Sequence, residues 1–180
     1  MNKVLAIIIG VLVVGGAGWF IISSRNAPEE SARQAESSPS RQAGEKVSDL
    51  ALQDYNGRTI NLTDFAGKPL VINSWAAWCP FCRKELPDFA TAQKEFGDKI
   101  VIIAVDRAET RETAKKYSDE LGVSDELIFL LDPQDSFYRA IGGFSMPETI
   151  FTDGNGNVII HKRGPMDLQE IREKIQQIIK

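Results

Sequence analysis

The sequence has few of the residues that bind metals or cross-link a fold. Its 180 residues include two cysteines, Cys79 and Cys82, and one histidine, His161. A zinc site that used both cysteines would need two further Cys or His ligands, and the chain has only one candidate. Two cysteines also exclude a disulfide framework, so the stability of the fold must come from an ordinary hydrophobic core.

Excess positive charge is absent as well. The formal net charge is −4, and the lysines and arginines form no basic cluster. A nucleic-acid-binding surface is therefore not expected. The sequence also has no internal repeat and no glycine-rich phosphate loop, and residues 154–156 (Gly-Asn-Gly) are typical of a turn.

Charged residues are missing from one long segment near the N-terminus, Val4 to Ile22. As a helix this segment would extend about 28 Å, close to the ~30 Å thickness of the hydrocarbon layer. We predict that residues 1–22 form an uncleaved signal-anchor transmembrane helix, with a cleavable signal peptide as the alternative. Lys3 precedes the segment, which favours a cytoplasmic N-terminus and a catalytic domain on the extracytoplasmic (periplasmic) side of the cytoplasmic membrane.

The next segment lacks the residues that build a core. Residues 23–43 contain no aromatic and no large aliphatic side chain. Such a segment buries too little apolar surface to offset its chain entropy, and we predict a disordered linker. The composition becomes globular from Gly44, so residues 44–180 are expected to form one domain.

Hydrophobic periodicity in residues 44–180 predicts strands that alternate with helices. Strands are expected at 47–53, 58–62, 70–75, 99–106, 127–131, 149–152 and 158–161. Helices are expected at 80–96, 109–121 and 136–140 and from Asp167 onward. Pro87 should kink the first of them. This order predicts an α/β sheet that is parallel in its first half and mixed at one edge.

The two cysteines lie where an apolar strand ends and a helix begins. Thiols at i and i+3 share one helix face, and the first, Cys79, falls at the helix N-terminus, where free N–H groups stabilise a thiolate. Pro80 suits the first helical position. A permanent structural disulfide would close too short a loop to stabilise much. Two inert buried thiols are the other alternative, but the pattern favours a dithiol that cycles between reduced and oxidised forms.

Four motifs carry a resemblance to a known family: Trp-Cys-Pro-Phe-Cys at 78–82, Pro87, Leu-Leu-Asp-Pro at 130–133, and Gly-Gly-Phe-Ser-Met-Pro-Glu-Thr at 142–149. With them, essentially all of residues 44–180 resembles the thioredoxin superfamily. The closer resemblance is to the membrane-anchored, extracytoplasmic thiol–disulfide oxidoreductases of the TlpA/ResA/DsbE-like kind. The resemblance implies a thioredoxin-like fold, with a central mixed sheet flanked by helices and an N-terminal β-hairpin extension.

The resemblance also implies the composition of the site. The Met146–Pro147 bond should be cis and should lie beside the disulfide, where the backbone of Met146 can bind an extended substrate. No cofactor is expected beyond the redox-active Cys79–Cys82 disulfide. The residues expected to contact substrate are Trp78, Pro80, Phe81, Met146, Pro147 and Glu148.

The sequence departs from thioredoxin behind the second cysteine. Asn73 stands where thioredoxin has a buried aspartate, and an amide cannot accept a proton from a thiol. The branch resembled here has an acid in the helix instead, and Glu85 matches it. Glu85 lies three residues after Cys82 and shares its helix face, so we expect it to assist proton transfer; an exposed helix charge is the alternative. Glu148 is a second candidate for the same role.

The expected reaction is a two-step thiol–disulfide exchange. Cys79 is predicted to be the exposed, low-pKa thiol that attacks a partner disulfide, and Cys82 the buried thiol that resolves the mixed disulfide. Trp75 is expected in the core, and His161 on the surface.

The resemblance implies protein disulfides as substrates, apocytochrome c among them in cytochrome c maturation, and an integral-membrane thiol donor. The alternative within the same class is a general reductase, or an oxidant, for exported proteins. A thiol peroxidase is less well supported, because Cys79 lies in no Pro/Thr-rich loop. A copper-binding assembly module would need wider cysteine spacing and a nearby histidine, and His161 belongs to the antiparallel hairpin.

Overall fold

The computed structural model describes residues 51–179. The predicted signal anchor, the linker and the first residues of the globular part lie outside this range. Within it, none of the helices has the length and apolar character needed for a membrane span.

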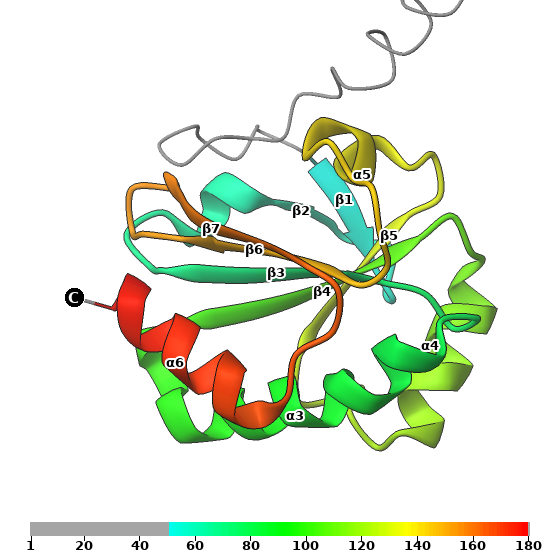
Figure 1. Cartoon of the computed structure of the whole chain (residues 1–180). Coiled ribbons are helices and arrows are strands. Elements are labelled where there is room, and N and C mark those ends of the chain that lie inside the picture. The colour runs from blue at the N-terminus through cyan, green and yellow to red at the C-terminus, as the bar shows by residue number, and fades with distance from the viewer. Residues whose placement is uncertain (1–50, 180) are drawn as a thin grey trace, which may run out of the picture. The chain divides into compact units, whose positions relative to one another are not determined.

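The described residues form one seven-stranded sheet with helices on both faces (Figure 1). Its strands are β1 (Ala51–Asp54), β2 (Thr59–Asn61), β3 (Leu70–Trp75), β4 (Val101–Arg107), β5 (Ile128–Asp132), β6 (Glu148–Thr152) and β7 (Val158–Arg163). The α-helices are α3 (Pro80–Phe96), α4 (Arg111–Glu120), α5 (Ser136–Ala140) and α6 (Leu168–Ile178). Two short 3₁₀ helices, η1 (Leu62–Phe65) and η2 (Gly97–Lys99), complete the chain order.

The sheet is parallel at its centre and antiparallel at both edges. The strand order is β2-β1-β5-β4-β3-β6-β7; β4 runs parallel to β3 and β5, and every other pair is antiparallel. The predicted α/β class and both hairpins are confirmed. The prediction of mixed pairing at only one edge is wrong, because the β1–β2 hairpin adds its strand β1 to the free edge of β5.

The register brings three chain segments together at one end of the sheet. Trp75, the last residue of β3, pairs with Asp106 near the end of β4. Ser74 pairs with Glu148, the first residue of β6. Because β6 is antiparallel to β3, the segment that enters β6 lies beside the segment that leaves β3. The cysteines and the Met-Pro dipeptide therefore meet at this end.

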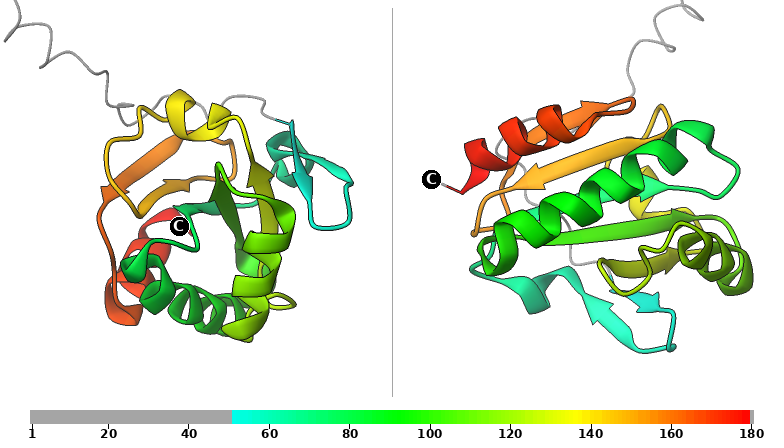
Figure 2. Two further views of the ribbon diagram at one scale, coloured as in Figure 1. Left: turned by 90° about the vertical axis from the view of Figure 1, so that its right-hand side faces the viewer. Right: turned by 90° about the horizontal axis from the view of Figure 1, so that it is seen from below.

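Two apolar cores lie on opposite faces of the sheet. The larger one packs residues of α3, α4 and α6 against β3, β4 and β5, and it contains Trp75, as predicted. The right-hand view of Figure 2 looks onto this face. The smaller core lies under α5, where Phe137 and Ile141 contact the opposite face of the same strands. Burial on both faces explains why β3 and β4 read as continuous apolar runs.

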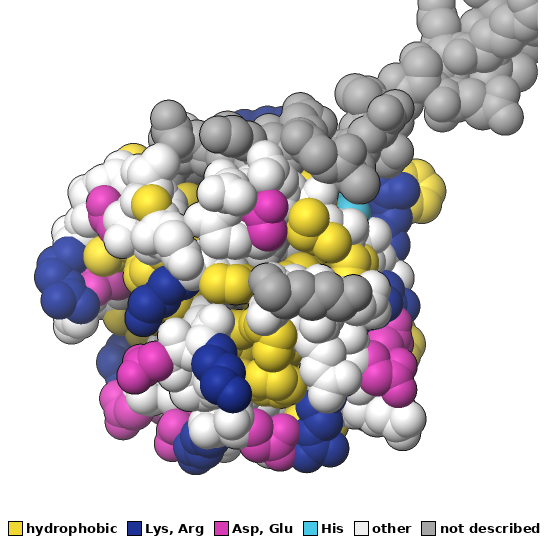
Figure 3. Space-filling model, turned by 90° about the vertical axis from the view of Figure 1, so that its left-hand side faces the viewer, with side chains coloured by type: hydrophobic (Ala, Val, Ile, Leu, Met, Phe, Trp, Pro, Cys, Tyr) yellow, Lys and Arg dark blue, Asp and Glu magenta, His cyan; other side chains and the backbone are white. Residues whose placement is uncertain are grey.

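Charged side chains of both signs are interspersed on the surface. Figure 3 shows one end of the molecule, where acidic and basic side chains alternate around a strip of hydrophobic ones. No extended patch of a single sign is seen on this face.

The last helix begins with a side-chain cap, as its sequence predicts. The carboxylate of Asp167 accepts a hydrogen bond of 2.8 Å from the backbone N–H of Glu170. The helix then buries Ile171, Ile175 and Ile178 against the sheet and α3.

We expect Asp167→Ala to lower the free energy of unfolding by about 1 kcal/mol, because it leaves an N–H of the first turn without its acceptor. Asp167→Asn keeps an acceptor oxygen and should cost less than half as much. Urea unfolding of the oxidised protein measures both values. Equal losses in the two variants would show that the cap does not stabilise the helix.

Candidate active site

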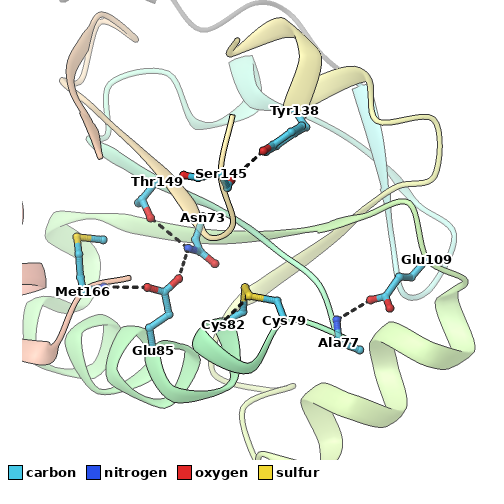
Figure 4. Close-up of a disulfide and its surroundings, with 10 residues drawn as sticks. All are labelled: Asn73, Ala77, Cys79, Cys82, Glu85, Glu109, Tyr138, Ser145, Thr149 and Met166. Carbon is cyan, nitrogen blue, oxygen red and sulfur yellow. Dashed lines mark hydrogen bonds between the residues drawn. A yellow bond between two sulfur atoms is a disulfide. The ribbon is translucent and has the colours of Figure 1, made fainter. Parts of the chain in front are cut away.

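The two cysteines form a disulfide at the start of α3 (Figure 4). Cys79 is the N-cap residue, with extended backbone, and Pro80 takes the first helical position. The backbone N–H of Cys82 points at the sulfur of Cys79 over 3.2 Å. After reduction, the same N–H and the helix dipole would stabilise a thiolate on Cys79.

Both cysteines are buried in this oxidised state. Cys79 is 2% exposed and Cys82 is completely buried. In this state Cys79 is therefore not exposed as predicted, because its side chain belongs to the larger core, against which Met146 also packs. Cys79 is nevertheless slightly less buried than Cys82, which is the predicted order of exposure.

Glu85 is buried behind the disulfide and is not an exposed helix charge. Its side chain is held by two donors (Figure 4): the amide of Asn73 at 2.7 Å and the backbone N–H of Met166 at 3.1 Å. Asn73 also donates to the hydroxyl of Thr149 at 3.1 Å. One buried polar group thus joins β3, α3, β6 and the segment before α6.

The environment of Glu85 favours its neutral form. Burial raises the pKa of this carboxyl to about 7, although the Met166 N–H, the Asn73 amide and the charge of Lys162 act in the opposite direction. A carboxyl group with this pKa can exchange a proton with a thiol near neutral pH.

Sequence reasoning missed Met166 and Thr149 as partners of this group. They lie 81 residues from Glu85 and 76 residues from Asn73, respectively. No local pattern links residues so far apart, and only the pairing of β6 with β3 brings Thr149 next to Asn73.

The Met146–Pro147 peptide bond is cis, as predicted. Pro147 is buried, and Met146 is half-buried against the core that contains both cysteines. The topology places this dipeptide next to the segment that carries Cys79.

Glu148 lies inside the protein and not on a substrate surface. One carboxylate oxygen accepts hydrogen bonds of 2.6 Å from the N–H groups of Phe144 and Ser145. The other oxygen, Oε2, lies 2.8 Å from His161 Nε2, whereas Arg163 Nε is 3.6 Å from the first oxygen, Oε1. Burial alone would raise the pKa of Glu148, but the His161 ring and these N–H groups hold it below its ordinary value.

These contacts correct two expectations. His161 is not a surface residue: its side chain is 8% exposed and pairs with Glu148. A carboxylate held by three donors is also poorly placed to accept a thiol proton or to touch a substrate. Glu148 instead fixes the backbone before the cis peptide.

A tyrosine holds the same loop from its other side. The Tyr138 hydroxyl donates to the Ser145 carbonyl at 2.8 Å, and Arg107 stacks 3.6 Å from the ring centre. A Cβ on Gly143 would lie 2.5 Å from the Tyr138 ring, so this position requires glycine.

Three aromatic side chains project from the segments around the disulfide. Trp78 is 62% exposed, Phe81 53% and Phe144 81%. Exposed large hydrophobic side chains are otherwise rare in residues 51–179, since Ile159 is the only further one. Pro80 is exposed beside them. The first two and Pro80 were predicted near the substrate; Phe144 was not singled out.

The described residues contain no group of three or more His, Cys, Asp or Glu side chains that could hold a metal ion.

A thioredoxin-like sheet with a Cys-x-x-Cys disulfide at a helix start and an adjacent cis-proline defines a protein thiol–disulfide oxidoreductase. The chain belongs to the Redoxin family, whose sequence model matches residues 42–177.

Two curated relatives and one solved structure illustrate this assignment. The thiol:disulfide interchange protein DsbE of Allochromatium vinosum is 34% identical over 133 residues, which cover 71% of this chain and 68% of the relative. The thiol-disulfide oxidoreductase ResA of Geobacillus thermodenitrificans is 29% identical over 136 residues, covering 75% and 77%. The crystal structure of a DsbE-like protein from Chlorobium tepidum superposes with a TM-score of 0.72 at 25% identity, covering 77% and 99%.

The raised pKa of Glu85 predicts a pH-dependent stability. Between pH 4.5 and about 7 the folded protein holds a proton on Glu85 that the unfolded chain has lost. The stability gained from this bound proton is complete below the unfolded-state pKa of 4.5, and it is lost as the pH rises to the folded-state pKa of about 7. The wild type should therefore lose on the order of 3 kcal/mol at most across this window.

Glu85→Gln cannot titrate, and the Asn73 amide can turn to offer it an oxygen. We expect this variant to gain stability relative to the wild type as the pH rises from about 5 to about 8, as measured by urea unfolding of the oxidised proteins. Glu120→Gln, at an exposed position of α4, is the control. A constant difference between wild type and Glu85→Gln across this range would contradict the prediction.

Proposed function

We propose that this oxidoreductase is a membrane-anchored, extracytoplasmic reductase of protein disulfides that acts in cytochrome c maturation. The observation that carries the reductive role is the buried carboxyl of Glu85, one helical turn after Cys82, with a pKa raised to about 7. Such a group can take the proton of the second thiol at the step that releases a reduced partner.

In the first step, the Cys79 thiolate attacks one sulfur of the partner disulfide. A bond forms between Cys79 and that sulfur, the partner disulfide breaks, and the other partner sulfur leaves as a thiolate. Since the Cys82 N–H faces the Cys79 sulfur, the helix start favours the thiolate needed for this attack.

In the second step, Cys82 gives its proton to the Glu85 carboxylate and attacks the sulfur of Cys79. The mixed disulfide breaks, the Cys79–Cys82 disulfide forms, and the partner leaves with both sulfurs reduced. Two electrons have passed to the partner, so a thiol donor must reduce Cys79–Cys82 again. In this proposal the donor is an integral-membrane protein.

The surface around the disulfide suits an extended polypeptide. The backbone of Met146 lies at the end of the sheet next to the cysteines and is proposed to pair with the substrate chain. The exposed rings of Trp78 and Phe81 supply flat apolar contacts beside the reacting sulfurs. These contacts select for an exposed, unfolded segment rather than for a small disulfide.

The cellular setting is proposed from sequence. The uncharged segment 4–22 supports a membrane anchor, and Lys3 supports an extracytoplasmic catalytic domain. The Gly-Gly-Phe-Ser-Met-Pro-Glu-Thr segment at 142–149 resembles that of the reductases that serve cytochrome c maturation, which supports apocytochrome c as a substrate.

Trapping variants test the order of attack. We expect Cys82→Ala to accumulate mixed disulfides with substrate proteins, since the second step cannot occur, while Cys79→Ala accumulates none. Non-reducing gels after acid quenching detect the adducts. Glu85→Gln should resolve its adducts about 10²-fold more slowly than the wild type or slower still, because it lacks the proton acceptor. Equal trapping by the two cysteine variants would refute these roles.

The reduction potential tests the direction. For a reductase we expect a Cys79–Cys82 potential of about −220 to −270 mV, by equilibration of the protein with glutathione or dithiothreitol. A potential around −120 mV would identify an oxidant and exclude the maturation role.

A further inference from the structure

A second buried acid lies on β4, the strand next to the one that leads to the disulfide. Asp106, near the end of β4, is completely buried opposite Trp75. Its carboxylate oxygens have no hydrogen-bond partner of ordinary geometry among residues 51–179, although the backbone N–H of Glu109 lies close enough to act against the rise in its pKa. Asp106 instead faces Glu109, whose carboxyl group lies within hydrogen-bonding reach of its own.

Glu109 connects this acid to the active-site loop. Its carboxylate accepts a hydrogen bond of 2.6 Å from the backbone N–H of Ala77 (Figure 4). Ala77 lies between Trp75, which pairs with Asp106, and Cys79, which caps α3. A continuous path therefore runs from the buried acid through Glu109 to the residue two positions before the cysteine.

Within residues 51–179, no cation is among the groups that act most strongly on Asp106. The negative charge of Asp132 on β5 also raises the pKa of Asp106. The charges of Asp106 and Glu109 in turn raise the pKa of Tyr55 in the β1–β2 turn. Asp119 on α4 also raises the pKa of Tyr55. The arginine of α3 on this side, Arg83, stacks over the Tyr117 ring at 4.6 Å.

We propose that Asp106 and Glu109 share one proton and act as positioning residues for the Cys79 thiol, because the shared proton keeps Glu109 bound to the Ala77 N–H. This role rests on the proposed function of Cys79 as the attacking thiol. It concerns carboxyl groups that touch neither substrate nor sulfur.

The physical reason is the repulsion between two carboxylates in contact. Without a cation they cannot both be ionised at little cost, so one of them keeps a proton. Asp106, the completely buried member, is the one that holds it and donates to Glu109. Glu109 then keeps accepting the hydrogen bond of 2.6 Å from the Ala77 N–H.

Loss of the shared proton would break the hydrogen bond between Glu109 and the Ala77 N–H. Burial and the neighbouring Glu109 raise the pKa of Asp106 to about 8. Above that pH two like charges would face each other, and only the half-buried Glu109 can turn toward water. Ala77 would then lose its acceptor, and the loop before Cys79 would no longer be fixed.

Carbon-detected NMR of the labelled full chain, in its oxidised form, tests the pair directly, because no thiol titrates there. We expect the carboxyl ¹³C signal of Asp106 and the amide ¹⁵N signal of Ala77 to shift together between about pH 6 and about pH 10. Asp106→Asn keeps a permanent donor to Glu109 and should leave the Ala77 signal unchanged across this range. Glu112→Gln, an exposed acid in the first turn of α4, should behave as the wild type.

A pH-independent Ala77 signal in the wild type, or the same shift in Asp106→Asn, would overturn the proposal. If Asp106→Asn does not fold, Glu109→Gln gives the second test. It keeps an acceptor for Ala77 but cannot hold the shared carboxyl–carboxylate proton, so the Ala77 shift should disappear and the Asp106 signal should titrate at a lower pH. Titration of Asp106 at its wild-type pH in this variant would contradict the pair.

The consequence for reactivity is measured on the reduced proteins by alkylation of Cys79. The ratio of the Asp106→Asn rate to the wild-type rate should be near one at about pH 6 and should differ several-fold at about pH 9. A merely structural effect would give a ratio that does not change with pH. Adduct trapping by Cys82→Ala is independent of both readouts, so a failure of this inference is distinguishable from a failure of the proposed function.

Discussion

The hydrogen bond between Asn73 and Glu85 is the constraint on which the site depends. A carboxyl group taken out of water costs several kcal/mol unless donors compensate for the lost hydration. Here the donors come from β3 and from the Met166 backbone before α6. The helix that begins at the cysteines is thereby fixed to β3 and to the segment before α6. The spacing of these elements, and so the place of the disulfide, follows from satisfying one buried group.

Three of the buried acids lie on α3, which carries Cys82, or on the strands next to β3, and their environments give them different pKa values. Glu148 has His161 and two backbone donors, and its pKa is lowered. Glu85 has two uncharged donors and a more distant cation, and its pKa is raised to about 7. Asp106 faces another carboxyl, and its pKa is raised further. Environments that push pKa values apart assign different tasks to chemically similar groups. One acid anchors a loop, one can move a proton, and one retains its proton.

The sequence predicted the fold and the reacting atoms because both follow from local patterns. Apolar runs gave the strands, and the Cys-x-x-Cys spacing at a helix start gave the disulfide. The burial of Glu85 and of His161 could not be predicted from local patterns. Each depends on partners from distant segments: Met166 for Glu85, and Glu148 on the neighbouring strand for His161. The i+3 spacing put Glu85 on the face of Cys82 but could not say what covers that face.

The choice of asparagine at position 73 can be understood from the second acidic pair. An aspartate there would place a carboxyl against Glu85, as Asp106 is placed against Glu109. The two would share a proton, and Glu85 would stay protonated or hydrogen-bonded to its neighbour at neutral pH. It could then not accept a proton from Cys82. An amide supplies the donor that the buried carboxylate needs and adds no charge. A proton acceptor at position 85 of the helix therefore requires a neutral hydrogen-bond donor at position 73 of the strand, and neither residue can be changed without affecting the other.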